Sequence, residues 1–212
     1  MICKLIDKTF VNANSLLLGE DTSGVKSLSI EVVEDTQFLV DLDDLAGINV
    51  SFVFNTPNVN SHVVGLYSLS GNQNLDVVLK AVHNVSNTSC LIDIKGVLYD
   101  ASQSFHMGEI YIGKNAFKTE SYLNDHSLLL GNKSKTVAMP NLRIHNNDVK
   151  ASHGASIGAL DDEKLYYLQS RGFEKKEAID ILVTGFFEST FNDITDQNMA
   201  NSLRHKLLTS LV

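Results

Sequence analysis

The residues best suited by type and spacing to catalysis or ligand binding lie in one stretch, DVKASHGASIGALDDEKLYYLQSRGF, residues 148–173. His153 stands there between Ser152 and Gly154, two small neighbours that leave the backbone free to be approached. A neutral imidazole can ligate a metal, move a proton or hydrogen-bond at a turn. The stretch predicts a short β segment up to this histidine, then a turn of small residues, then a helix. On the residues alone, all three roles of the histidine stay open.

A serine hydrolase is the first chemistry that this stretch suggests. Residues 154–158 match G-x-S-x-G, and aspartates and then His205 follow in the chain order of an α/β-hydrolase triad. That nucleophile elbow requires a parallel sheet interleaved with helices and followed by further strands, whereas only helical patterns follow here. Ser152 and His153 are no dyad either, because neighbours on an extended strand point to opposite faces. A nucleophilic serine is therefore not expected.

Metal and nucleotide motifs are absent from the sequence. None of the seven histidines forms an HxH, HxxxH or HExxH pair, and without GxxxxGK[ST] no ATP is expected to bind this chain through a P-loop. Asp41, Asp43 and Asp44 form an acidic cluster that would suit calcium or glycosidase chemistry, although an acidic surface turn explains it more simply. Cys3 and Cys90 are too few to hold an iron–sulfur cluster, so a partner would have to supply the other ligands.

Length and composition narrow the class of protein. The chain has 212 residues, is 43% hydrophobic and carries a formal net charge of −8, which allows one sizeable core. No Lys/Arg run occurs, so nucleic acid is not an expected partner. No apolar signal region and no 18-residue apolar run occur, so we expect no membrane span. Two distant cysteines without a CxxC pair favour a reducing compartment, and we expect a cytoplasmic protein.

The elements that would position His153 are a β body followed by helices. Alternate residues from Ile48 to Phe54 are apolar, and further short apolar runs separated by Asn- and Gly-containing turns continue to about residue 150. No helical pattern interrupts these runs, which leaves a sandwich or a β-solenoid, although no repeat of fixed period is visible. We expect residues 1–158 to form a β core and residues 159–212 a helical segment.

Three helices are expected in the C-terminal segment. Asp161 can cap the first, and Gly172 marks its end. The second spans roughly residues 174–191, and the third begins near Asp196. Their apolar stripes are expected to pack on the β body or, for the thin third helix, to serve a partner. The stripes consist of Ile179, Leu182, Val183, Phe186 and Phe187 on the second helix, and of Met199, Leu203, Leu207 and Leu211 on the third.

The opening stretch closely resembles the SufB/SufD family of iron–sulfur cluster assembly proteins, and the SufD branch in particular. The shared pattern is Asp-Val-Lys, a small residue or Cys, Ser-His-Gly-Ala, a Gly, Leu-Asp-Glu-Glu, an aromatic pair and Arg-Ser-Arg-Gly. Upstream, KGVL (residues 95–98) and PNLRI (residues 140–144) fall in the family's order. The resemblance is specific over residues 90–190.

The resemblance implies a right-handed parallel β-helix (solenoid) followed by a short C-terminal helical segment, acting as a non-enzymatic scaffold of the SUF system. Its partners would be a SufC-type ABC ATPase, docked on residues 160–212, and a SufB-like subunit or a second copy of the chain. The family's functional histidine falls on His153, which would bind a transient iron–sulfur cluster at a shared interface. Ala151 stands where many SufD proteins have Cys, and Met107 where a glutamine is expected, so a possible thiolate ligand is missing.

A β-helix protein that binds or cleaves carbohydrate is the alternative to this scaffold. The acidic cluster at residues 41–44 and the solenoid interpretation motivate it. Association with an ABC-type ATPase would support the scaffold, whereas glycan binding or cleavage without such association would support the alternative. For the scaffold, Phe186, Phe187 and Met199 are among the apolar side chains expected to be available to the ATPase.

Overall fold

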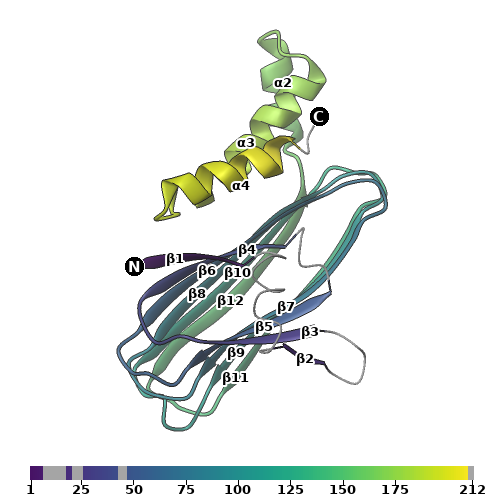
Figure 1. The fold of residues 1–212 in the computed structure, drawn as a ribbon. Helices are drawn as coiled ribbons and strands as arrows, with labels where there is room; N and C mark the ends of the chain where they lie inside the picture. Colours follow the sequence, from purple (N-terminus) through teal and green to yellow (C-terminus); the bar gives the residue numbers. More distant parts are fainter. Residues whose placement is uncertain (7–17, 21–25, 43–46, 210–212) are drawn as a thin grey trace.

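A computed structural model of the chain describes residues 1–6, 18–20, 26–42 and 47–209. Its β part consists of two six-stranded sheets (Figure 1). Sheet A contains, in spatial order, β1 (Ile2–Ile6), β4 (Thr36–Asp41), β6 (Asn60–Leu69), β8 (Ser89–Leu98), β10 (Thr119–Leu129) and β12 (Val149–Ala159). Sheet B contains, in spatial order, β11 (Lys135–Ile144), β9 (Gln103–Ile112), β7 (Asn74–His83), β5 (Ile48–Phe54), β3 (Lys26–Glu31) and β2 (Leu18–Glu20).

The two sheets belong to one β-solenoid. From β3 onward, successive strands alternate between sheet B and sheet A, so that each turn of the chain gives one strand to each sheet. Neighbouring strands are parallel throughout, apart from the antiparallel pair of β2 with β3. The expected parallel β-helix is thereby confirmed, and the sandwich is excluded.

The number of residues per turn varies along the solenoid, which is why the sequence shows no fixed repeat. Neighbouring strands of sheet A are offset by 25 residues between β4 and β6 and by 29 residues between β6 and β8. The offset is 31 residues between β8 and β10 and 30 residues between β10 and β12. The turns that join the strands absorb these differences, so the strands stay in register although the sequence period drifts.

The interior of the solenoid holds the main hydrophobic core. Buried and half-buried residues alternate along β5, as its sequence predicts. Its inward side chains pack with those of the other strands, among them Phe38, Val63, Tyr67 and Ile92 of sheet A. The core therefore lies between the two sheets and is built by stacking one turn on the next.

The expected helices are confirmed as α2 (Asp162–Ser170), α3 (Lys175–Asn192) and α4 (Gln197–Thr209). The Asp161 carboxylate caps α2 by accepting hydrogen bonds from two backbone N–H groups, and Gly172, with a φ of 98°, follows its last residues. Asp196 caps the start of α4 in the same way. The division of the chain into a core of residues 1–158 and a segment of residues 159–212 stays a prediction.

A second hydrophobic cluster fixes α3 and α4 on the outer face of sheet A, the side of the sheet that faces away from the interior (Figure 1). It joins Leu39, Val64, Leu66 and Val97 of the sheet to Val183, Phe187 and Phe191 of α3 and to Ala200, Leu203 and Leu207 of α4. The stripe of α3 therefore packs on the β body as predicted, and so does that of α4, for which a face left free for a partner was the alternative. Leu211 lies outside the described residues. By contrast, α2 buries none of its side chains.

One local prediction is wrong. The small-residue turn expected after His153 does not form, because β12 continues as a strand to Ala159 and carries the whole G-x-S-x-G match. The backbone of β12 runs in register with β10, and this pairing overrides the weak strand preference of Gly and Ala. Within the described residues, the helices are too short or too polar to cross a membrane.

Candidate functional site

The candidate site lies at the open end of the solenoid, which is the layer formed by β11 and β12. These are the last strands of sheet B and sheet A, and each pairs with a described strand on one side only. β10 alternates between buried and half-buried residues, whereas most residues of β12 are exposed. An unpaired parallel edge presents free backbone N–H and C=O groups, and a partner chain can add to it. The open end is therefore a surface that a partner can cover.

His153 points toward the interior side of this end layer. Its register partner on β10 is Leu123, an inward residue of the core. In-register neighbours on parallel strands share a face, so the imidazole continues the inward column while Ser152 faces outward. His153 is exposed because no described turn covers the end layer. The imidazole thus lies where a partner that caps the solenoid would meet it.

The surroundings of His153 are small and open. Ala151 and Ala155 flank it on the same face of β12, and a Cβ added to Gly154 would meet no atom within 4 Å. The His153 side chain makes no hydrogen bond or ion pair with any described residue, and so the turn-stabilising role considered for it has no support. Its nitrogen atoms are available to a group brought from outside.

Neither thiol of the chain reaches His153. Cys90 lies on β8 in the same inward column as Ala151, with Ser121 between them. Two strand spacings put Cys90 about 10 Å below the end layer. Its side chain is buried, and burial raises the pKa of the thiol far above its usual range. Cys3 lies on β1, at the opposite edge of sheet A.

A metal site made by this chain alone is not found in the described part of the sequence. No group of three or more His, Cys, Asp and Glu side chains is placed to hold a metal ion there. Of the acidic cluster, Asp41 accepts a hydrogen bond from Lys206, and Asp43 and Asp44 lie outside the described residues. His153 is therefore a single candidate ligand, and a metal or cluster at the open end would need others from a partner.

Sequence patterns missed a polar cluster inside the solenoid, one layer below the open end. His106 Nδ1 and Asp125 Oδ2 are 3.2 Å apart and both side chains are buried, while the Tyr67 hydroxyl lies 2.8 Å from Ser127 Oγ. Burial raises the pKa of Tyr67 far above its usual range. Gly96 makes room for the Tyr67 ring, since a Cβ there would lie 1.9 Å from it. The signal in the sequence was weak, because these residues occupy inward strand positions that normally hold apolar side chains.

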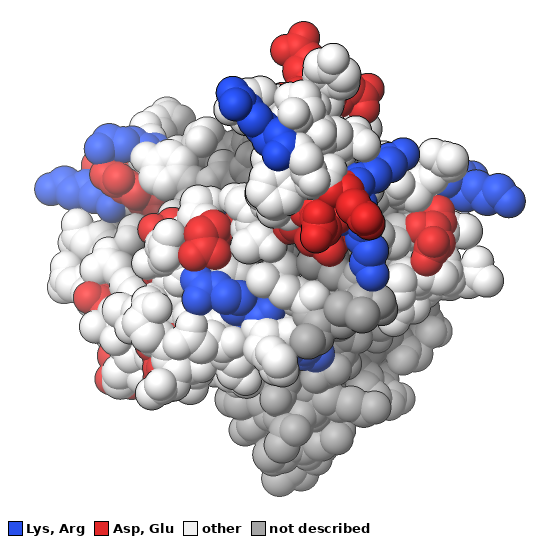
Figure 2. All heavy atoms as spheres, turned by 90° about the horizontal axis from the view of Figure 1, so that it is seen from above, with Lys and Arg blue, Asp and Glu red and all other residues white. Residues whose placement is uncertain are grey.

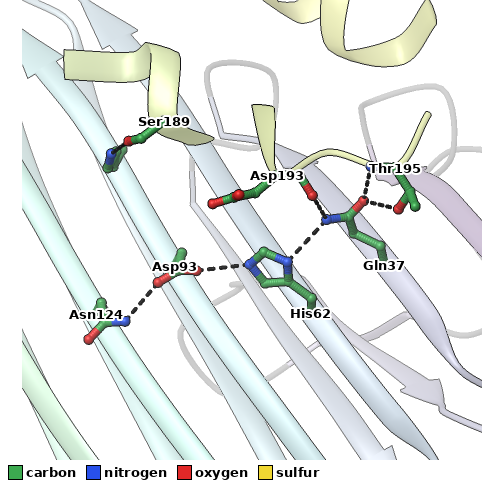
Figure 3. Close-up of polar contacts among 8 residues, drawn as sticks. Gln37, His62, Asp93, Asn124, Ser189, Asp193 and Thr195 are labelled. Carbon is green, nitrogen blue, oxygen red and sulfur yellow. Dashed lines mark hydrogen bonds and ion pairs between the residues drawn. The ribbon is translucent and has the colours of Figure 1, made fainter. Parts of the chain in front are cut away.

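A second polar group, which we call the outer-face chain, crosses sheet A beneath the helices (Figure 3). It runs from Gln37 to His62, Asp93 and Asn124, with Gln37 Nε2 to His62 Nδ1 at 3.0 Å, His62 Nε2 to Asp93 Oδ2 at 2.8 Å and Asn124 Nδ2 to Asp93 Oδ1 at 2.8 Å. Burial would raise the pKa of Asp93, but the hydrogen bonds from His62 and Asn124 outweigh it and the pKa is lowered. The Asp93 carboxylate is therefore held ionised.

Lys95 adds a polar anchor for α3 beside the outer-face chain. Its Nζ donates to the Phe186 carbonyl at 3.0 Å and to Ser189 Oγ at 2.8 Å. The ammonium also lies 5.3 Å from the centre of the Phe186 ring, within cation–π range. Desolvation lowers the pKa of Lys95, although the carboxylates of Asp93 and Asp193 act against that shift. Sheet A thus holds α3 by charge as well as by apolar packing.

The apolar surface left over for a partner differs from the sequence prediction. Phe187 is fully buried against sheet A, and Phe186 and Met199 are half-buried, because their stripes face the β body. In the C-terminal segment the exposed large side chains lie instead on α2, before α3 and in its first half: Tyr166, Tyr167, Phe173 and Ile181. A groove of about 400 Å³ lies beside them, lined in part by Leu128, Leu160, Leu182 and Phe186. Lys/Arg and Asp/Glu side chains are interspersed on the face seen from above (Figure 2).

Comparison with known proteins gives one consistent result. Residues 32–186 match the family model described as "SUF system FeS cluster assembly, SufBD core domain". The iron-sulfur cluster assembly SufBD family protein ycf24 of Galdieria sulphuraria is 31% identical over 122 residues, 58% of this chain and 55% of that protein. The iron-sulfur cluster assembly protein SufD of Escherichia coli (strain K12) is 30% identical over 105 residues, 50% of this chain and 25% of that protein. The matched region thus covers between a quarter and about half of these relatives.

Proposed function

The chain belongs to the SufBD core family of the SUF system for iron–sulfur cluster assembly, and from this premise we propose that it is a non-enzymatic scaffold subunit. Its open end would form one half of an interfacial site on which a cluster is assembled. The observation that carries the proposal is the placement of His153, exposed and without a described partner, on the uncovered last layer of the solenoid. A scaffold needs this arrangement, because a ligand at an unfilled interface is completed only when the assembly forms.

The partner at the open end would be a SufB-like subunit or a second copy of this chain. Covering β11 and β12 would satisfy the free backbone groups of both strands and bury the side chains exposed there. Val137, Met139 and Ile157 are between 46% and 50% exposed at this end, which gives the contact an apolar component. The small residues beside His153 allow a partner backbone to come close.

In this proposal His153 binds iron of the nascent cluster, which is the cargo of the scaffold and not its resident cofactor. A neutral imidazole binds iron, whereas iron–sulfur clusters prefer thiolates. With Ala151 in the end layer and Cys90 buried below it, the thiolates would come from the partner. No step in this scheme asks the chain for acid–base or nucleophilic catalysis.

The C-terminal helices would dock a SufC-type ABC ATPase. The surface proposed for this contact, called the docking surface below, is formed by Tyr166, Tyr167, Phe173 and Ile181. Helices α3 and α4 would support it from the outer face of sheet A. ATP would be bound and hydrolysed by the partner, in a cytoplasmic complex.

Co-expression with the ATPase, a SufB-like subunit and a sulfur source tests the role of His153. His153→Ala should leave the complex intact and reduce the iron and sulfide recovered with it severalfold, and His153→Cys should restore part of the loss. His145→Ala is the matched control, because His145 is also exposed near the open end but lies against the Tyr111 ring. Normal cluster content in His153→Ala, or an equal loss in the control, would remove the ligand role.

A further inference from the structure

The orientation of the Gln37 amide is fixed by backbone atoms of the connection between α3 and α4, residues 193–196. Gln37 Nε2 lies 3.0 Å from the carbonyl oxygen of Asp193, which can only accept. Gln37 Oε1 lies 2.8 Å from the backbone N–H of Thr195, which can only donate, and it also accepts from the Thr195 hydroxyl. The amide therefore has one arrangement that satisfies both backbone groups (Figure 3).

This arrangement selects one state of His62. Gln37 Nε2 keeps its second hydrogen for His62 Nδ1, which must therefore accept. The remaining ring proton is then on Nε2, where it is donated to Asp93, whose other oxygen accepts from Asn124. A neutral imidazole meets all of these requirements at once, whereas an imidazolium carries a proton on both nitrogens. The outer-face chain is thus complete only with neutral His62.

We propose that Gln37 and His62 form a proton-operated latch that fastens the α3–α4 connection to sheet A and releases it when His62 is protonated. A proton on Nδ1 sets donor against donor at the Gln37 contact. If the amide turns over to accept that proton, its oxygen faces the Asp193 carbonyl and its nitrogen faces the Thr195 N–H. In the first case the Gln37–His62 hydrogen bond that orients the amide is lost, and in the second the turned amide also forfeits both backbone bonds to the connection.

Charged and titratable groups surround the latch on every element that packs there. Asp93 and Lys95 lie on β8, His126 on β10, Cys3 on β1, and Asp193 and Asp196 in the connection itself. The Asp93 carboxylate accepts from His62 Nε2 and the Gln37 amide faces Nδ1, whereas the Lys95 ammonium donates to α3. The latch is therefore set by the balance between Asp93 and the Gln37 amide, whose backbone partners tolerate only the neutral ring.

Release is local because apolar packing keeps the helices in place. Ile194, between the two latched residues, is 1% exposed, and Phe191 and Ala200 on either side of the connection belong to the same cluster. The expected motion is an opening of the connection and of the first turn of α4, of the kind that native-state hydrogen exchange detects. The latch involves only this contact between the connection and sheet A, and it operates whether or not an ATPase docks on the helices.

Amide hydrogen exchange of the full chain at about pH 5.5 and at about pH 8, within the range where histidines titrate, tests the latch. After correction for the intrinsic exchange rates, the opening equilibrium at Thr195 and the start of α4 should be roughly 10-fold to 30-fold larger at the lower pH, as two lost backbone hydrogen bonds predict. Amides in β8 and β10 should show no such change. Equal protection at both pH values would overturn the proposal.

Two variants separate a latch from a merely structural contact. His62→Gln cannot titrate, yet its amide can accept from Gln37 and donate to Asp93, so the pH dependence should vanish. Gln37→Glu should reverse it, because a carboxylate beside Nδ1 prefers the imidazolium. His126→Gln, on the same face, is the control and should keep the wild-type dependence. Persistence of the pH effect in His62→Gln, or an unchanged sign in Gln37→Glu, would refute the mechanism.

Discussion

The docking surface can be tested without disturbing the fold. Tyr166 and Tyr167 are 74% and 56% exposed on α2, a helix with no buried residue. Replacing both with Ser should change the free energy of unfolding by less than about 0.5 kcal/mol per site, as surface substitutions usually do. Aromatic anchors of interfaces lose roughly 2 kcal/mol or more on truncation, so the double variant should bind the ATPase at least about 25-fold more weakly.

For Phe187→Ala on α3 we expect the reverse, a loss of folding stability without a loss of ATPase binding. Phe187 is fully buried, with its ring centre 5.2 Å from that of Phe186 and 6.0 Å from that of Phe191. Truncation of a buried phenylalanine costs about 3–5 kcal/mol of folding stability, because it removes transfer free energy and leaves a cavity. The molecules that remain folded keep their docking surface and should bind the ATPase with unchanged affinity.

Titration calorimetry of each variant with the ATPase, together with urea unfolding, measures both quantities. Wild-type binding by the tyrosine double variant, or weakened binding by fully folded Phe187→Ala, would refute this assignment of the two helices. Deletion of residues 174–212, which removes α3 and α4, is a poorer test. It would uncover Leu39, Val64, Leu66 and Val97 on sheet A, and the loss of binding could then arise from aggregation.

Two further predictions concern the solenoid itself. Gly96→Ala should lower the free energy of unfolding, measured in urea, by about 1–3 kcal/mol or more, because its Cβ would overlap the buried Tyr67 ring. Gly154→Ala should leave it nearly unchanged, because a Cβ there meets nothing within 4 Å. Equal effects of the two substitutions would contradict this packing. Because the pKa of Asp93 is lowered in the folded state, its ionised form stabilises the fold fully above the unfolded-state pKa of about 3.9, and this stabilisation is lost as the pH falls through the folded-state pKa. Asp93→Asn should therefore weaken the dependence of the unfolding free energy on pH in that acid range. An unchanged dependence would show that Asp93 is not the linked group.

Hydrophobic alternation predicted those strands whose inward positions are apolar. β5 is found within the limits that its pattern indicates, and α2 begins after the cap predicted at Asp161. Helices α3 and α4 begin next to the expected residues 174 and 196. The later strands are longer than their apolar runs. β10 has Ser121, Asp125 and Ser127 at inward positions, and β12 has alanines and His153 among its inward positions, so neither shows the period of a half-buried strand. Backbone pairing with the preceding turn, which the sequence does not display, extends them.

The polar groups of the site depend on register and could be predicted only in part. The family pattern singled out His153, but its exposure follows from the end of the solenoid at β12. The outer-face chain is bound to the α3–α4 connection through Gln37 and Thr195, which lie 158 positions apart along the sequence. A change of one residue in the offset between two strands would turn these side chains to the other face. Because that offset varies from turn to turn, no spacing rule brings them together.

The metal-binding side chains at the open end help to decide whether the partner is a second copy of the chain or a different subunit. Two copies of this chain joined through their open ends by a twofold axis would each contribute the same surface. In the described residues, that surface offers imidazoles, those of His153 and nearby His145, and no thiol, since Cys90 is buried two strands below and Cys3 lies at the far edge of sheet A. Imidazoles alone suit zinc or mononuclear iron better than an iron–sulfur cluster, which is usually held by thiolates. The donor set at the open end therefore favours pairing with a different subunit that brings cysteine to the interface.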